Sequence, residues 1–275
     1  MRLAVVNDAG QRKTVVLVED RAYFLADVAK QYDKPLLTLI EQQQLKGLQN
    51  ELLQVDWEQA PFTFVADAKL DIPYTGAAHI FGVGVNYVAK AEDLQFTPDA
   101  KPVCFLKTND VLVGPDVDIT YPHFSQQVSA EGELALIIGK PCFEVSEDEA
   151  LSYVAAYTTA LDLTAKDVHA ENPRFMQISK LFKGSCSFGP EIKLLEGDVA
   201  ALEVKTLQNG QVVHQNVVSN MMFTPAFIVS YLSKYVTLLP GDIILTGTPG
   251  SFDVSVGDVA ECHVSGLMPL KNNIR

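Results

Sequence analysis

The stretch Ser129-Ala130-Glu131-Gly132-Glu133-Leu134-Ala135-Leu136-Ile137-Ile138-Gly139-Lys140 decides the fold. Its apolar run over 134–138 is typical of a strand that is buried on both faces. Because side chains alternate along a strand, Glu131 and Glu133 are expected on the same face. Two carboxylates this close repel unless a proton or a cation lies between them. The alternative for an isolated pair of this kind is an exposed acidic strand end.

Most of the chain around this stretch is strand-like. Asn209-Gly210 separates two of the segments and predicts a hairpin. Helices are expected over 35–53, 148–161 and 225–236. The predicted strands cover 3–6, 14–18, 80–85, 103–106, 133–138, 202–207, 211–217, 242–245 and 259–264. The strands outnumber the helices without a regular β-α-β rhythm, which predicts a mixed, β-rich α+β fold.

A third carboxylate changes the interpretation of the acidic pair. Ser146, with Glu149 three residues later, predicts the start of the helix over 148–161, which would end just before Asp162. Three acidic oxygens suit a hard cation such as Mg²⁺ or Mn²⁺, with open positions left for water and substrate. The alternative for Asp162 alone is a cap or turn residue.

Composition excludes several classes of protein. The chain has 275 residues, with 21 Lys and Arg against 34 Asp and Glu, so its net charge is −13. No basic surface for nucleic acid is expected. The four cysteines form no C-x-x-C pair, which argues against a zinc cage and favours a reduced, cytoplasmic location. No apolar run approaches the eighteen or so residues that span a bilayer, so no membrane partner is expected.

Three common catalytic motifs are missing. Gly82-Val83-Gly84 lacks the third glycine of a dinucleotide-binding fingerprint, because Tyr87 occupies its place. Gly184-Ser185-Cys186-Ser187-Phe188-Gly189 has the wrong spacing for a nucleophile elbow. The five histidines show no metal-ligand spacing, and none is assigned to a metal.

A series of short motifs recurs in order from about residue 80 to the end of the chain. They are Gly82-Val83-Gly84-Val85-Asn86-Tyr87, Phe105-Leu106-Lys107, Glu131-Gly132-Glu133-Leu134-Ala135, Ile138-Gly139-Lys140, Leu161-Asp162-Leu163-Thr164-Ala165-Lys166-Asp167, Pro240-Gly241-Asp242 and Thr246-Gly247-Thr248-Pro249. Together they resemble the fumarylacetoacetate hydrolase family. The resemblance implies a small N-terminal domain over 1–74, a catalytic domain of the mixed β-roll type over 75–275, and a homodimer.

The resemblance also implies roles for single residues. The family's metal ligands fall on Glu131, Glu133 and Asp162, the same three carboxylates as above. Its active-site lysines fall on Lys107 and Lys180, and the threonine that meets the substrate carboxylate falls on Thr248. Tyr87, in the first of these motifs, and Gln177, three residues before Lys180, are predicted to bind substrate. The alternatives are solvated lysines and a turn hydroxyl before Pro249.

The sequence departs from the hydrolytic members of the family after Tyr87. Those members carry a histidine followed by a glutamate, whereas here Lys90 stands at the histidine position, with Glu92 and Asp93 nearby. A lysine needs a strongly depressed pKa to act as a general base near neutral pH. Carbon-carbon hydrolysis by the usual route is therefore disfavoured.

A second departure concerns the segment after Asp162. His169-Ala170-Glu171-Asn172-Pro173, followed by Gln177, Lys180 and Gly184-Ser185-Cys186-Ser187-Phe188-Gly189-Pro190, resembles the 2-keto-3-deoxy sugar acid dehydratase branch of the family. The alternative is that Glu-Asn-Pro only ends a helix.

These observations lead to one main hypothesis about function. The chain is expected to be a Mg²⁺-dependent enzyme, with Mn²⁺ as a possible substitute, that binds a small 2-oxo acid through its carboxylate and 2-oxo oxygen on the metal. Dehydration, decarboxylation and isomerisation share the enolate that would follow. Two alternatives remain open: a carbon-carbon hydrolase of acylpyruvates, and a non-catalytic protein that binds 2-oxo acids.

Overall fold

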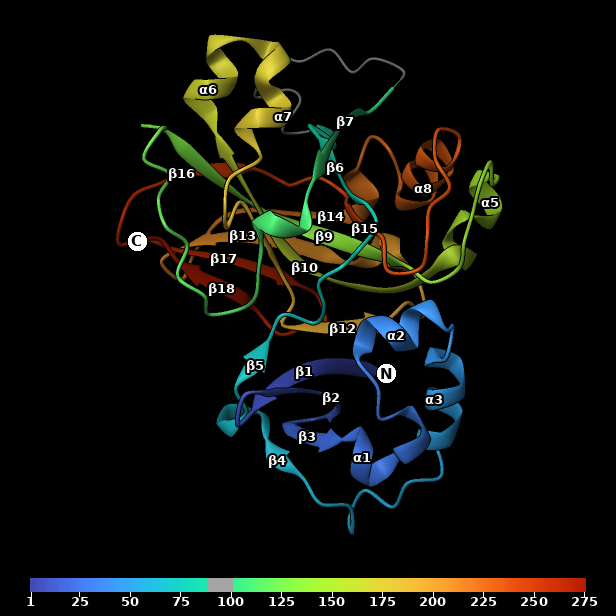
Figure 1. Ribbon diagram of the computed structural model, residues 1–275. Coiled ribbons are helices and arrows are strands. Elements are labelled where there is room, and N and C mark those ends of the chain that lie inside the picture. The colour runs from blue at the N-terminus through green and yellow to red at the C-terminus, as the bar shows by residue number, and fades with distance from the viewer. Residues whose placement is uncertain (89–100) are drawn as a thin grey trace.

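The computed structural model describes residues 1–88 and 101–275 (Figure 1). The strands are β1 (Arg2–Asp8), β2 (Gln11–Val18), β3 (Arg21–Phe24), β4 (Thr63–Phe64), β5 (Leu70–Asp71), β6 (Ile80–Gly84), β7 (Val103–Lys107), β8 (Leu112–Val113), β9 (Val128–Ile138), β10 (Val154–Ala165), β11 (Cys186–Phe188), β12 (Glu191–Leu194), β13 (Glu203–Gln208), β14 (Gln211–Val217), β15 (Ile243–Leu245), β16 (Ser251–Val254), β17 (Val259–Val264) and β18 (Leu270–Asn273). The α-helices are α1 (Leu25–Val28), α2 (Leu36–Glu41), α3 (Leu45–Leu52), α5 (Glu147–Ala150), α6 (Lys166–Glu171), α7 (Met176–Ser179) and α8 (Pro225–Ser233).

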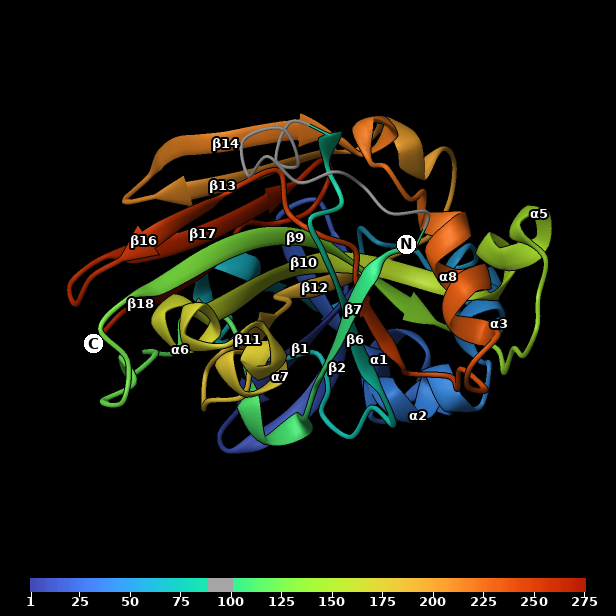
Figure 2. The ribbon, with the colours of Figure 1, turned by 90° about the horizontal axis from the view of Figure 1, so that it is seen from above.

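Two sheets organise the described residues. The larger sheet has fourteen strands, with the main order β4-β3-β2-β1-β12-β10-β9-β15-β6-β7, and the smaller has the order β14-β13-β17-β18. Figure 2 shows the small sheet lying over β9 and β10. The mixed, strand-rich α+β fold predicted from the sequence is confirmed.

The antiparallel pair of β9 and β10 forms the centre of the larger sheet. All residues of β9 are buried, as the unbroken apolar run predicted. The register places Glu131 opposite Asp162 and Glu133 opposite Ala160. The acidic residues therefore lie where both faces of the sheet are covered by protein.

The prediction of a helix over 148–161 is wrong for most of that range. The helix there is α5. It ends at Ala150, a single 3₁₀ turn covers Leu151–Tyr153, and the chain then enters β10. Val154, Tyr157 and the neighbouring threonines are β-branched or aromatic residues that favour strands. β10 pairs with β9 along its length. Hydrogen bonds between the two strands therefore satisfy buried N–H and C=O groups of both. Asp162 is therefore a strand residue and caps no helix.

The N-terminal part of the chain is built on a hairpin formed by the strands predicted over 3–6 and 14–18. β1 and β2 pair antiparallel, and β1 also pairs with β12, so the larger sheet continues from this hairpin into the rest of the chain. The helical pattern over 35–53 forms two helices, α2 and α3, whose apolar faces are buried with Leu39, Ile40 and Leu48.

The hairpin predicted at Asn209-Gly210 is confirmed by the pairing of β13 with β14. Both turn residues have positive φ angles, 54° and 79°, as the mirror-image turn of a two-residue hairpin requires. The helix predicted over 225–236 is α8, which begins at Pro225 after the Thr224 cap. Among the described residues, no helix is both long and apolar enough to cross a membrane.

Candidate metal and substrate site

Three carboxylates from the two central strands meet in the interior. Glu131 and Glu133 on β9 and Asp162 on β10 each offer an oxygen, and these oxygens lie within 4.8 Å of one another. The exposed fractions of the three residues are 9%, 1% and 0%. The alternation predicted for β9 thus brings both glutamates to the same face, where Asp162 joins them from the paired strand.

The Lys180 ammonium group lies among these carboxylates. Its Nζ is 3.2 Å from Glu131 Oε2, contacts Asp162 Oδ2, and donates to Thr164 Oγ1 at 2.8 Å. Phe105 lies beneath it, with 4.4 Å from Nζ to the ring centroid. Lys180 directly follows α7, so the position of this short helix sets the position of the ammonium group.

Lys107 lies on the other side of Asp162 and is more enclosed. Its Nζ is 2.7 Å from Asp162 Oδ1 and donates to the carbonyl oxygens of Lys180 at 3.0 Å and Ser185 at 2.7 Å. The Ser185 hydroxyl is a further partner, at 3.2 Å. The side chain has no exposed surface. These contacts hold Asp162 and the segment that carries Lys180 together.

Glu133 is the least compensated of the three carboxylates. Burial raises its pKa well above the ordinary value of a glutamate, and the charges of Asp162 and Glu131 raise it further. Its Oε2 accepts a hydrogen bond from the N–H of Gly247 at 2.6 Å, and among the described residues it makes no ion pair. A buried carboxylate in this position favours either a proton or a cation beside it.

The charge of Lys180 is maintained by its neighbours. Burial alone would lower the pKa of this lysine, but the carboxylates of Asp162 and Glu131 raise it above the ordinary value. Lys180 is therefore an ammonium ion in the structure. In this state it can stabilise a negative charge that develops beside it.

The Tyr87 hydroxyl is a further buried polar group near the carboxylates. The residue is fully buried, and its hydroxyl has no hydrogen-bond partner among the described residues. Burial, followed by the nearby charge of Glu133, raises its pKa. A buried hydroxyl without a partner costs free energy, and a bound ligand would remove that cost. The three carboxylates and this hydroxyl form a donor set that fits a hard divalent cation with an oxygen-rich ligand.

Thr248 lies in the loop between β15 and β16, two strands that both pair with β9. It is 2% exposed. Its hydroxyl donates to the carbonyl of Gly250 at 2.8 Å. In the structure this hydroxyl therefore serves the turn, as the alternative interpretation of the sequence anticipated. The same loop supplies the Gly247 N–H that contacts Glu133.

Gln177, predicted to bind substrate, is engaged elsewhere. Its side-chain amide contacts Leu106 O and accepts from Leu106 N at 3.0 Å. Leu106 belongs to β7, the last strand at that edge of the larger sheet's main order. The Gln177 amide thus makes the hydrogen bonds to Leu106 N and O that a further strand at this edge would make. These bonds hold α7 against the sheet.

Several residues near the site were missed in the sequence. Thr164 lies two residues beyond Asp162, and strand alternation would have placed it on the same face; the incorrect helix assignment concealed this. Asn86 ties the Tyr87 segment to the loop after β15 by donating to Thr246 O at 2.8 Å. Ser185 lies in the segment 184–190, which was considered above for its spacing and its resemblance but with no role for Ser185. Lys90, Glu92 and Asp93 lie outside the described residues.

Gly247 offers a local test of this geometry. Its φ is +98°, and an added Cβ would lie 2.7 Å from Asn86 Cβ and 3.0 Å from Val83 O. We expect Gly247→Ala to displace the N–H from Glu133, to destabilise the protein by about 2–4 kcal/mol, and to weaken Mn²⁺ binding. Gly257→Ala is the matched control, because Gly257 has a φ of +99° with no atom within 4 Å of the added Cβ.

Thermal denaturation and Mn²⁺ titration of both glycine variants would check this prediction. Equal losses of stability and of Mn²⁺ affinity in the two variants would show that only the backbone angle matters. The contact of Gly247 with Glu133 would then contribute nothing to metal binding.

Gln177→Ala tests whether the amide positions Lys180. We expect turnover to fall by about tenfold while KM changes little, since the substituted side chain lies against β7 and the loss acts through the placement of α7. Gln211→Ala, at an exposed position on β14, is the control. A change confined to KM would instead assign Gln177 to substrate binding, as the resemblance implied.

Residues 79–275 match the family model described as "Fumarylacetoacetate (FAA) hydrolase C-terminal". Oxaloacetate tautomerase fahd2, mitochondrial, from Xenopus laevis is 32% identical over 220 residues, which cover 76% of this chain and 69% of that protein. A 4-hydroxyphenylacetate degradation bifunctional isomerase/decarboxylase from Salmonella dublin is 32% identical over 233 residues, 84% of this chain and 53% of that protein.

A solved structure with a bound metal shares the fold. Maleylpyruvate hydrolase from Sphingobium sp. SYK-6, in complex with manganese(II) ion and pyruvate, aligns with a TM-score of 0.80 at 25% identity. The alignment covers 100% of this chain and 98% of that chain. The similarity therefore extends over the N-terminal part as well as over residues 79–275.

Proposed function

Because the chain belongs to the fumarylacetoacetate hydrolase family, we propose that it is an enzyme that acts on a small 2-oxo acid with a divalent cation, Mg²⁺ or Mn²⁺. Glu131, Glu133 and Asp162 would hold the cation. The observation that carries the proposal is the buried Glu133 carboxylate, which has a raised pKa, lies beside two further carboxylates, and makes no ion pair among the described residues. When bound, the cation would act as a Lewis acid toward the oxygens of the substrate.

The side chains of the protein divide the remaining tasks. Lys180, an ammonium ion at the edge of the cluster, would donate a proton to the substrate or stabilise the charge of its enolate. Lys107 is enclosed and would act as a positioning residue that fixes Asp162 and the Lys180 segment. The Tyr87 hydroxyl, for which residues 1–88 and 101–275 supply no hydrogen-bond partner, would donate to a substrate oxygen. Thr248 would meet the substrate carboxylate if its hydroxyl turned away from Gly250.

The reaction class follows from the enolate. Isomerisation, decarboxylation and dehydration all pass through it, and the names of two relatives include tautomerase and isomerase/decarboxylase activities. The proposal agrees with the presence of lysine at position 90, where hydrolytic members carry a histidine. We further propose a catalytic unit over 75–275 with a small N-terminal domain over 1–74, and a cytoplasmic homodimer.

Carbon-carbon hydrolysis is the second candidate. It is favoured by the structural similarity to a maleylpyruvate hydrolase, a protein whose structure contains pyruvate and manganese(II). Lys90 or another residue would then have to activate water in place of the family's histidine.

A panel of 2-oxo acids, assayed with Mg²⁺ and with Mn²⁺, tests these alternatives. We expect metal-dependent turnover of oxaloacetate or of a keto-deoxy sugar acid, followed by ketone-enol absorbance and by release of CO₂ or water-elimination products. Pyruvate release from acetylpyruvate at an enzyme-like rate would favour the hydrolase. Tight binding of these acids without turnover of any would contradict an enzymatic role and indicate a binding protein.

A further inference from the structure

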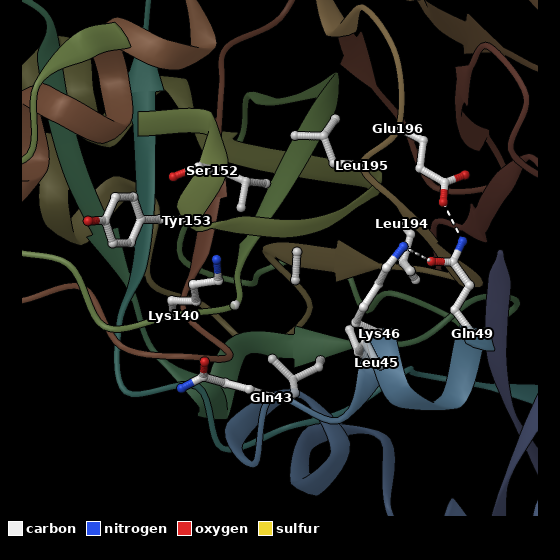
Figure 3. A pocket seen from close by; sticks show the side chains of 14 residues that line it. Gln43, Leu45, Lys46, Gln49, Lys140, Ser152, Tyr153, Leu194, Leu195 and Glu196 are labelled. Carbon is white, nitrogen blue, oxygen red and sulfur yellow. Dashed lines mark hydrogen bonds between the residues drawn. The ribbon is translucent and has the colours of Figure 1, made fainter. Parts of the chain in front are cut away.

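A pocket of about 260 Å³ lies between the N-terminal helices and the central strands, away from the acidic cluster (Figure 3). α2 and α3 form one wall, and the ends of β10 and β12 form the other. Gly139 and Lys140, which directly follow β9, close one side. We call this the N-terminal pocket. Glu133 and Gly139 are six residues apart along an extended chain, about 20 Å, so the pocket is distinct from the site described above.

The walls of the N-terminal pocket are mainly apolar. Ile40, Val154, Ala155 and Leu194 line it, and Ile40, Val154 and Leu194 are buried. Apolar walls with a few convergent polar groups are typical of small-molecule sites. The volume lies slightly below the usual range for drug-sized ligands, which favours a smaller molecule with a short hydrocarbon chain.

Two lysines give the pocket a local positive charge. Figure 3 shows Lys140 and Lys46 on opposite sides, with Gln43 below them. Among the described residues, the Lys140 ammonium makes neither a hydrogen bond nor an ion pair. Within the same described residues, Lys46 makes no ion pair, and it donates to the neutral amide of Gln49 at 3.0 Å.

Among the described residues that line the pocket, Glu196 is the one carboxylate. Glu196 contacts the side-chain amide of Gln49 and lies 3.7 Å from the amino terminus of Met1. Glu196 therefore offsets part of the positive charge of Lys46, but Lys46, Lys140 and the amino terminus together outnumber this one carboxylate. In a chain with a net charge of −13, two ammonium groups over apolar walls form a local site for an anion.

We propose that the N-terminal pocket binds a small carboxylate that carries a short apolar chain. The carboxylate would lie between Lys140 and Lys46, and the chain would lie against Ile40 and Val154. Such a ligand would contact the N-terminal helices and the far ends of the two strands that carry the acidic cluster. The proposal does not depend on the function proposed above.

Hexanoate is a suitable probe, with hexan-1-ol as its uncharged counterpart. Calorimetric titrations would use the native protein with Mg²⁺ and excess oxalate present. Oxalate would then occupy the proposed substrate site at the acidic cluster, so hexanoate could not bind there. We expect hexanoate to bind one site per chain at least about fivefold more tightly than hexan-1-ol, which is the effect of an accessible ion pair near 1 kcal/mol.

Two variants locate the binding. Lys140→Met should weaken hexanoate by about fivefold and leave hexan-1-ol unchanged, whereas Lys30→Met, an exposed lysine outside the pocket, should change neither. Ser152→Trp, at an exposed position in the pocket wall, should block both ligands without disturbing the core. The proposal would be overturned if the two probes bound with equal affinity or if hexanoate did not bind at 20 mM. It would also be overturned if neither pocket variant changed the affinity for hexanoate.

Discussion

Replacing Glu133 with glutamine is expected to weaken Mn²⁺ binding by more than about a hundredfold and to raise the thermal stability of the metal-free protein. Loss of a ligand should cost more than the tenfold to hundredfold typical of groups that only support ligands. Stability should rise because burial and two neighbouring carboxylates raise the pKa of Glu133 in the folded protein.

The sign of the stability change follows from linkage. A carboxyl group whose pKa is raised on folding destabilises the folded state once the pH exceeds its unfolded pKa, because the folded protein resists ionisation. Glutamine removes this penalty and can still accept the hydrogen bond from Gly247. We expect Tm at pH 7 to rise by about 2–4 °C, which corresponds to about 1 kcal/mol for a chain of this size.

Differential scanning calorimetry and Mn²⁺ titration would measure both effects on the same samples. Glu147→Gln, at an exposed position at the start of α5, is the matched control and should change neither quantity. A Glu133→Gln protein that binds Mn²⁺ as tightly as the native chain would contradict the proposed ligand set.

Replacing Lys107 with methionine is expected to destabilise the protein by about 3–5 kcal/mol, the range for a broken buried ion pair. The substitution would leave Asp162 Oδ1 without its ion-pair partner and would remove one of the donors to the carbonyls of Lys180 and Ser185. These groups lie in the interior and cannot turn to water. Methionine has a similar length, so the loss of stability would come mainly from the missing ammonium group and not from a cavity.

The proposed division of roles between the two lysines makes this prediction specific. Lys107→Met should lower Tm by about 10 °C, whereas Lys180→Met should chiefly abolish turnover in the presence of saturating Mg²⁺, because the cation would still compensate Glu131 and Asp162. Lys30→Met serves as the control for thermal denaturation. A Lys107→Met protein with native Tm and no activity would reverse the assignment and make Lys107 the catalytic lysine.

The acidic cluster was predictable because it depends on short-range geometry. Alternation along one strand places Glu131 and Glu133 on the same face, and this holds wherever the strand lies in the fold. Asp162 was found as a chemically suitable partner, but the reason given for its position was wrong. The structure brings it to Glu131 through the pairing of β9 with β10.

Strand β10 was misassigned because its local sequence is ambiguous. A buried strand shows no alternation between apolar and polar residues, so a run such as Val154 to Leu161 resembles a buried helix. A helix does begin directly after Ser146, whose Oγ donates to Glu149 Oε2 at 2.8 Å, but the Ser146 side chain caps no backbone N–H. The helix nevertheless ends after one turn, because pairing with β9 outweighs the local preference.

Features that depend on distant segments could not be predicted. Lys107 and Ser185 meet only because β7 and the segment after α7 lie against β10. Gln177 was assigned to substrate, yet its amide is held by the backbone of β7. The N-terminal pocket joins residues 40–49, 139–155 and 194–196, and no local pattern in the sequence indicates that these segments face one another.

Calorimetric titration of oxalate, a mimic of the pyruvate enolate, tests the central claim most directly. It would be performed with the native protein and with Glu133→Gln, each in the presence and absence of Mg²⁺. The account predicts binding to the native protein only when Mg²⁺ is present, and none to Glu133→Gln under either condition. Oxalate binding that is equally tight without Mg²⁺, or that is retained in Glu133→Gln, would contradict a cation-dependent 2-oxo acid site at Glu131, Glu133 and Asp162.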